Sequence, residues 1–411
     1  MGGVGPMFGQ AGHFRFYAPV EQPYAQERYR NEMLRLYGVL DRRLEGREFV
    51  AGDYSIADMA IWPWVITYKR QEVNLEEFAN VRRWYKALQG RPGLRRAVAG
   101  KVRGLYGMDP EPEEEVTVFC GATEALFSTI MALVEPGDEA VLIEPAYDSY
   151  APCVVMAGGT VRWVPLDPDD LSLDLDTLAR AMGPRTKLVL LNTPMNPTGK
   201  VFTPDEIRRI GALVRRHDAY LVCDEVYEHL TYDGREHRPA ATIDDLGERT
   251  VTISSTAKTF SMTGWKVGYA IASPALSDAI RRSHQFVTFA TSTPFQHAMA
   301  AAIDRSDEYY GEFLATYVAR RDLMLGFLRD AGCGVIEPQG TYYVMADITP
   351  LGFDDDVEFC RYLPREVGVA AIPVSAFYQE RREGRNVVRF AFCKRREVLE
   401  RAGERLRGLG D

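Results

Sequence analysis

The stretch KLVLLNTPMNPTGKVFTPDEIRRIGALVRRHDAYLVCDEVY, residues 187–227, decides the fold class of this chain. Its two apolar runs, KLVLLN (187–192) and YLVC (220–223), have the short, branched character of strands that are buried on both faces. A helix is predicted between them, because Thr203 can cap its first turn and Glu206 can close a capping box. One face of this helix carries its apolar residues, Ile207, Ile210, Leu213 and Val214. The order strand, helix, strand is typical of a parallel sheet.

The same alternation continues on both sides of this stretch. From Glu115 onward short apolar runs alternate with helical patterns, and VTIS (251–254) is a further predicted strand. Beyond about Asp304 the pattern predicts a second α/β unit that ends in a helix around Arg396 to Leu406. We therefore expect a mostly parallel α/β domain followed by a smaller α/β domain.

Residues 1–88 have a different, all-helical pattern. Apolar side chains recur every three or four residues through QERYRNEMLRLYGVLDRRL (26–44), which predicts an amphipathic helix that ends near Gly46. Ser55 can cap a second helix while Asp58 reaches back to the Ser55 backbone N–H. A third helix is predicted over about 75–88. This part of the chain is therefore predicted to be a separate helical domain.

Composition limits the classes of partner. The net charge of −9 over 411 residues argues against a dominant attraction to nucleic acid or anionic lipid, so we expect a small-molecule partner. The six cysteines form no C-x-x-C pair and no two histidines stand four residues apart, so no metal site and no disulfide framework is expected. No apolar run approaches the roughly 18 residues of a membrane span, and the first residues lack the character of a signal peptide. We expect a cytoplasmic location.

Four polar segments directly follow predicted strands, where open α/β sheets place their ligand crevice. They are GATEA (121–125), NTPMNPTG (192–199), DEVY (224–227) and STAKTF (255–260). The sequence therefore predicts a small-molecule site at one edge of the sheet.

These four segments resemble, in order and spacing, the signature of the class I/II (fold-type I) aminotransferases. Two later segments, GWKVG (264–268) and VRF (388–390), fit the same signature. Within that family the chain is similar to kynurenine and methionine aminotransferases, through EPAYDSYAP (144–152), SSTAKTFSMTGWKVGY (254–269) and GVAAIPVSAFY (368–378). The resemblance implies pyridoxal 5'-phosphate (PLP) as cofactor, a PLP-binding large domain (89–304), a small C-terminal domain (305–411) and a homodimer.

The resemblance assigns three catalytic residues. Lys258 matches the Schiff-base lysine, which bonds to the cofactor aldehyde and moves the proton at the substrate Cα. Asp224 matches the carboxylate that keeps the ring nitrogen protonated, and Tyr227 matches a donor to the cofactor's phenolic oxygen. The plain alternatives are a surface lysine and a turn aspartate at the end of a strand.

The remaining matches bind the cofactor or the substrate. Asn196 matches a second donor to the phenolic oxygen and a substrate contact, and Tyr147 matches the aromatic that stacks on the ring. A turn asparagine and a core tyrosine are the alternatives here. Arg389 matches the arginine that binds the substrate carboxylate as a two-pronged cation. The phosphate ligands match Ala122, Thr123, Ser255 and Lys266, the last at a position where many relatives have arginine.

The helical part resembles the C-terminal domain of glutathione transferases. The matching text is GGVGPMFGQAGHF (2–14), PYAQERYRNEMLRLYGVLDRRL (23–44) and GDYSIADMAIWPWV (52–65). We do not expect glutathione transferase activity, because the thioredoxin-like domain that supplies most glutathione contacts in that family is absent from the sequence. A natural fusion and an artefact of recombination or assembly would both give such a join.

The predicted reaction is amino-group transfer between an uncharged or aromatic L-amino acid and a 2-oxo acid. The helices stand where a full-length relative has part of its small domain and of its substrate pocket, so we expect cofactor binding with weakened or lost turnover. Two alternatives remain open. A cysteine-conjugate β-lyase would release pyruvate without an oxo-acid acceptor, and a non-catalytic dimerisation or binding protein would co-purify with a partner as a colourless preparation.

Overall fold

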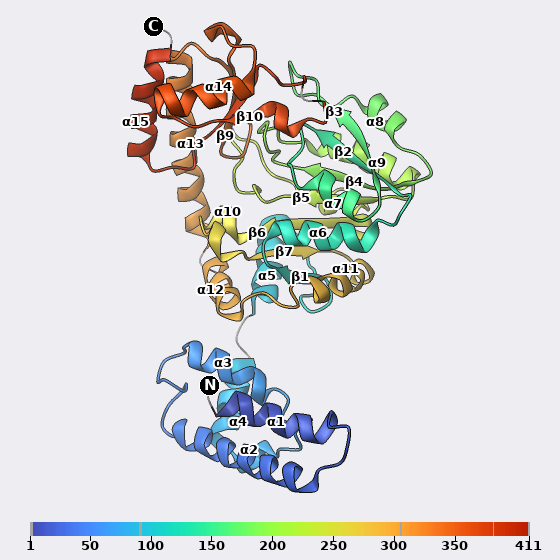
Figure 1. Ribbon diagram of the computed structural model, residues 1–411, viewed down its shortest axis with the longest axis vertical. Coiled ribbons are helices and arrows are strands. Elements are labelled where there is room, and N and C mark those ends of the chain that lie inside the picture. The colour runs from blue at the N-terminus through green and yellow to red at the C-terminus, as the bar shows by residue number, and fades with distance from the viewer. Residues whose placement is uncertain (1–2, 90–92, 305, 381, 410–411) are drawn as a thin grey trace. The chain divides into compact units, whose positions relative to one another are not determined.

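The computed structural model describes residues 3–89, 93–304, 306–380 and 382–409 (Figure 1). The chain divides into two compact units, Met1–Gly93 and Leu94–Asp411. The first is helical, and the second is an α/β unit with two sheets. None of the helices in the described residues combines the length and apolar character that a membrane span needs.

The first unit packs four helices around a core of its own. The apolar stripe predicted for the long helix is confirmed, because Met33, Leu36 and Leu40 are buried. The buried Asp58 closes the predicted capping box by accepting from Ser55 N, and its other oxygen accepts from Trp84 Nε1 at 2.8 Å. The helices are α1 (Val4–Phe16), α2 (Pro23–Arg43), α3 (Ile56–Val65) and α4 (Ala79–Gln89), with a 3₁₀ turn, Leu75–Glu77, before the last.

Residues 1–88 were predicted to be helical, but none of the three helices predicted within them corresponds to α1. Glycine is a weak helix former, and Gly5 and Gly9 lie within this helix. In the structure the indole of Trp64 packs against them, 3.4 Å from the place of a Cβ at Gly5 and 3.8 Å at Gly9. Tertiary packing therefore explains both the glycines and the helix.

The large lobe of the second unit is built on a seven-stranded, mostly parallel sheet. Its strand order is β1-β7-β6-β5-β4-β2-β3, and only β7 runs against its neighbours. The strands are β1 (Val116–Phe119), β2 (Glu139–Glu144), β3 (Thr160–Pro165), β4 (Thr186–Asn192), β5 (Tyr220–Asp224), β6 (Thr250–Ser255) and β7 (Gly268–Ile271). The three strands predicted from apolar runs are confirmed as β4, β5 and β6.

Helices cover both faces of this sheet (Figure 1), which explains the apolar runs of its central strands β4 and β5. One face packs on α6 (Ala122–Leu133), α7 (Tyr150–Met156) and α11 (Pro274–Val287). The other packs on α8 (Leu175–Ala181) and α9 (Pro204–Arg216), while α5 (Leu94–Tyr106) and α12 (Thr293–Ile303) cover β1 and β7. The predicted capping box of α9, between Thr203 and Glu206, is present.

The small lobe is a four-stranded antiparallel sheet with helices packed on it. The strand order is β10-β11-β9-β8, and the apolar core lies between the sheet and the helices α13, α14 and α15. The final helix occupies the predicted residues. The elements are α13 (Ser306–Asp330), β8 (Gly334–Ile336), β9 (Tyr343–Asp347), α14 (Asp356–Tyr362), β10 (Ile372–Pro373), β11 (Val387–Ala391) and α15 (Arg396–Leu406).

Candidate active site

The predicted site residues come together around one cavity of about 330 Å³ at the carboxyl ends of the parallel strands. The loop after β1, the ends of β4, β5 and β6, and strand β11 of the small lobe all contribute to its wall. All ten residues line it: Ala122, Thr123, Tyr147, Asn196, Asp224, Tyr227, Ser255, Lys258, Lys266 and Arg389. Residues separated by more than 260 positions in the sequence thus share one small space.

Asp224 is the only acidic side chain that lines this cavity among the described residues. It ends β5, and its carboxylate accepts hydrogen bonds from the Tyr150 hydroxyl at 2.7 Å and from Val226 N at 3.3 Å. Burial raises the pKa of Asp224 to about 6, although these hydrogen bonds and the Lys258 ammonium partly oppose the rise. A cationic partner in the cavity would therefore be stabilised by this carboxylate.

Lys258 and Tyr227 face the same space. Lys258 lies on α10 (Thr256–Thr259), which directly follows β6, and its Nζ donates to the Tyr342 hydroxyl at 3.0 Å. Burial raises the pKa of Tyr227 well above its ordinary value, so its phenol stays protonated and can donate a hydrogen bond. Its hydroxyl lies 3.2 Å from that of Tyr343.

One end of the cavity is shaped to receive an anion. The helix α6 starts at Ala122 after Gly121, whose φ of 89° is readily adopted only by glycine. A Cβ at Gly268 would lie 2.6 Å from Ala122 N, so glycine there lets β7 approach the start of this helix. Backbone N–H groups at a helix start and the side chain of Lys266 favour a phosphate group. The Ser255 hydroxyl also lines this end and in this structure donates to Val267 O at 3.1 Å.

The opposite wall holds Arg389. Strand β11 alternates half-buried and buried residues and places Val388 and Phe390 in the core. The Arg389 guanidinium donates to Asn196 Oδ1 at 2.6 Å and lies over the rings of Tyr343 and Phe377, with Cζ to ring-centre distances of 4.0 and 4.9 Å. Its buried Nε has no hydrogen-bond partner among the described residues. The Arg389 guanidinium is therefore held in place, and its Nε–H can still donate a hydrogen bond to a ligand.

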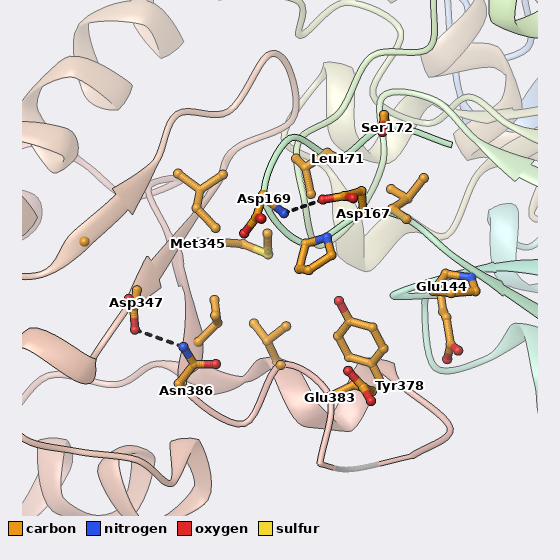
Figure 2. A pocket seen from close by; sticks show the side chains of 18 of the residues that line it. Glu144, Asp167, Asp169, Leu171, Ser172, Met345, Asp347, Tyr378, Glu383 and Asn386 are labelled. Carbon is orange, nitrogen blue, oxygen red and sulfur yellow. Dashed lines mark hydrogen bonds between the residues drawn. The ribbon is translucent and has the colours of Figure 1, made fainter. Parts of the chain in front are cut away.

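A second and larger cavity, of about 840 Å³, lies between the β3–α8 loop and the small lobe. Figure 2 shows its acidic side chains, among them Glu144, Asp167, Asp169 and Asp347. No lysine, arginine or histidine is among its described lining residues, and none of the ten predicted site residues lines it. A cavity of this charge disfavours phosphate and carboxylate groups. The smaller cavity is therefore the candidate active site.

The sequence matches the family model "Aminotransferase class I and II" over residues 59–406. The chain belongs to this family. A second model, "Glutathione S-transferase, C-terminal domain", matches residues 5–92, so the two matches overlap within the helical unit.

Curated relatives of this aminotransferase act on different substrates. The chain is 44% identical over 332 residues to a probable N-succinyldiaminopimelate aminotransferase of Mycobacterium tuberculosis, covering 78% of this chain and 84% of the relative. It is 38% identical over 325 residues to the methionine aminotransferase of Escherichia coli, covering 79% and 84%, and 36% identical over 353 residues to kynurenine–oxoglutarate transaminase 1 of Mus musculus, covering 78% and 83%.

Solved structures agree with the fold. The N-succinyldiaminopimelate aminotransferase of M. tuberculosis superposes with a TM-score of 0.75 at 45% identity, covering 77% of this chain and 83% of that one. The E. coli protein described as having a methionine aminotransferase function gives a TM-score of 0.74 at 38% identity, covering 77% and 82%.

Aminotransferases of this family use PLP, and the cavity fits that cofactor. Its lining offers a buried carboxylate for a pyridinium nitrogen, a glycine-bounded helix start for a phosphate, and a lysine amine for an aldehyde. The spare donor on Arg389 fits a substrate carboxylate in addition.

Sequence reasoning missed several residues of this aminotransferase site. Tyr150, which donates to Asp224, and Tyr343, which lies against Arg389, both line the cavity. Tyr342 does not line the cavity, but its hydroxyl accepts a hydrogen bond from Lys258. Each of these contacts joins positions more than 45 residues apart, so no local spacing signals it.

A buried polar network beneath the site was also missed. Glu228 accepts hydrogen bonds from Lys101 Nζ at 2.7 Å, from the Tyr106 hydroxyl at 2.8 Å and from Ser254 Oγ at 2.5 Å. Burial would raise the pKa of Glu228, but the charge and hydrogen bond of Lys101, together with the neighbouring His229 and His237, outweigh burial and hold that pKa well below the usual range. Because Glu228 follows Tyr227 and Ser254 precedes Ser255, this network fixes the backbone of two site segments to α5.

Proposed function

We propose that this aminotransferase moves the amino group of an uncharged or aromatic L-amino acid to a 2-oxo acid, and that the ten lining residues hold PLP and substrate. In this proposal Asp224 would hold the ring nitrogen, Tyr227 and Asn196 would hold the phenolic oxygen, and Tyr147 would cover one face of the ring. Ala122, Thr123, Ser255 and Lys266 would hold the phosphate.

The charges of the cavity are the observation that carries the proposed substrate class. Among its described lining residues the cations are Lys258, Lys266 and Arg389. The proposal uses each once: Lys258 for the aldehyde, Lys266 for the phosphate, and Arg389 for the α-carboxylate. No lining cation is left for a carboxylate on the substrate side chain, and burying an unpaired carboxylate is unfavourable. Aromatic side chains such as Tyr147 and Tyr343 instead offer contacts to apolar or aromatic donors.

The chain's own groups account for the proton movements. Bound PLP would supply an aldehyde that bonds to an amine and a ring that accepts electron density from the substrate Cα. Lys258 Nζ takes the Cα proton, and Arg389 with Asn196 orients the α-carboxylate so that this proton faces the lysine. The ionised Asp224 keeps a proton on the ring nitrogen, which maintains the electron-accepting character of the ring.

A comparison of donors tests the proposed substrate class. Methionine, phenylalanine, kynurenine and glutamine are assayed with a common oxo acid against glutamate, aspartate and N-succinyldiaminopimelate. We expect kcat/KM for the best uncharged donor to exceed that for the dicarboxylic donors by at least about tenfold, since an unpaired buried charge costs more than 1.4 kcal/mol. Preferred turnover of N-succinyldiaminopimelate would contradict the charge argument.

Weakened turnover and a homodimer are two further predictions. The same assay tests the first, because the kcat of this chain can be compared with that of the E. coli methionine aminotransferase. The homodimer is tested by light scattering of the purified chain.

A further inference from the structure

The amine of Lys258 is held by a phenol. Its Nζ donates to the Tyr342 hydroxyl at 3.0 Å and lies 5.7 Å from the ring centre of Tyr227 and 5.6 Å from that of Tyr342. Lys258 belongs to the large lobe, whereas Tyr342 immediately precedes strand β9 of the small lobe. Because Lys258 lines the cavity and Tyr342 does not, this hydrogen bond holds the nitrogen at the cavity wall.

Tyr342 is itself firmly placed. Only 8% of its surface is exposed, and its ring packs edge-on against Tyr227 and Tyr343, with ring centres 5.1 and 4.7 Å away. Tyr317 stacks on it with centres 6.0 Å apart. The hydroxyl therefore offers a fixed reference point for a flexible lysine.

A phenol suits this place better than a carboxylate. Burial raises the pKa of Tyr342 to about 12, so the group stays neutral near pH 7. A neutral hydroxyl accepts a hydrogen bond from an ammonium group and donates one to a neutral amine, so it holds Nζ in either protonation state. A carboxylate would favour the ammonium form alone and would oppose the use of the amine as a base.

We propose that Tyr342 is a positioning residue for Lys258, which holds Nζ at a fixed point whenever the amine is not bonded to the cofactor. The inference rests on the proposed role of Lys258. In the proton transfer the Cα–H bond breaks, Nζ receives the proton, and the electron pair stays with the substrate and its electron-accepting cofactor. Tyr342 keeps its own proton throughout and acts only by fixing where Nζ starts.

The first test uses the cofactor-free protein. Brief acetylation with N-acetoxysuccinimide, followed by peptide mass spectrometry, measures the reactivity of Lys258 in wild type, Tyr342→Phe and Tyr317→Phe. We expect several-fold faster acetylation in Tyr342→Phe, because losing the phenol frees the lone pair of a neutral amine and removes an acceptor from an ammonium. Tyr317→Phe, which removes a hydroxyl from the neighbouring ring, should match wild type. Equal rates in all three proteins overturn the proposal.

The second test uses the PLP-loaded enzyme. With a donor deuterated at Cα, Tyr342→Phe should lower kcat by about tenfold, change KM less than about threefold, and raise the primary isotope effect, because proton transfer becomes slower. A fall in thermal stability and PLP affinity without a larger isotope effect shows a merely structural role and overturns the proposal. If the Lys258→Ala variant still forms the visible absorbance band of bound PLP, Lys258 is not the amine that bonds to the cofactor, and the proposed function is wrong. The acetylation rates are measured without cofactor, so they test the hydrogen bond to Tyr342 independently of that outcome.

Discussion

Replacing Asp224 with asparagine tests how the negative charge of this carboxylate affects protein stability and PLP binding. The change keeps an oxygen that can accept from the Tyr150 hydroxyl and removes the charge. In the cofactor-free protein the pKa of Asp224 is raised from 3.8 to about 6, chiefly by burial. Between these values the folded protein binds more protons than the unfolded chain, so the contribution of Asp224 to stability falls as pH rises from about 4 through 6.

The size of the effect follows from the two pKa values. The raised pKa of Asp224 lowers the stability of the folded protein by roughly 1.6 kcal/mol at pH 5 and roughly 3 kcal/mol at pH 8, relative to low pH, where the carboxyl is protonated in both the folded and the unfolded state. Asparagine carries no such cost. Without cofactor, the free energy of unfolding of Asp224→Asn, relative to that of wild type, should therefore be about 1.4 kcal/mol greater at pH 8 than at pH 5.

The measurement is urea unfolding of both proteins without cofactor at the two pH values, repeated with saturating PLP. With PLP at pH 8 wild type should gain more stability than the variant, because only its carboxylate can pair with a protonated ring nitrogen. A difference between the two cofactor-free proteins that does not change with pH would refute the argument. So would equal stabilisation of both proteins by PLP.

Three further substitutions test other parts of the site. Lys258→Ala should abolish the visible band of bound PLP and lower kcat by at least about 10²-fold, measured by absorbance and steady-state kinetics. Arg389→Gln should raise KM for the amino donor roughly ten- to hundred-fold, through loss of a charge-assisted hydrogen bond, while Arg385→Gln, at an exposed arginine, should leave KM unchanged. Gly268→Ala should weaken PLP binding in a fluorescence titration, because its Cβ would meet the start of α6, whereas Gly264→Ala has open space and should bind normally.

The features predicted correctly from the sequence are those with local causes. The capping boxes at Ser55 and Thr203 are encoded within four residues, and both are present. The strands β4, β5 and β6 stand out because a sheet covered on both faces needs continuous apolar runs. The ten site residues were named from the resemblance to the aminotransferases, and the four polar segments that contain most of them follow strand ends, which in a parallel sheet share one edge.

The features that were missed depend on packing between distant segments. Lys101 and Glu228 pair across 127 positions, and Lys258 and Tyr342 across 84, with no spacing in the sequence that signals either contact. The helix α1 was missed for a different reason. Its glycines argue locally against a helix, and tertiary packing, of Trp64 against those glycines and of Phe8 against Tyr37, accounts for it.

A seam between the two lobes, formed by residues 144–147 and 377–379, connects the acidic cavity to the active site. Glu144, which lines the acidic cavity, accepts from Gln379 N at 3.0 Å, and Ala146 N donates to Phe377 O at 2.8 Å. Tyr147 lines the active site directly after this seam, and the Phe377 ring lies against Arg389. The segment proposed to cover the cofactor ring and the segment that contacts Arg389, the arginine proposed to bind the substrate carboxylate, are thus joined by two hydrogen bonds. A shift of the small lobe that breaks them would loosen cofactor and substrate contacts together, so binding of the substrate carboxylate and placement of the cofactor ring should be coupled.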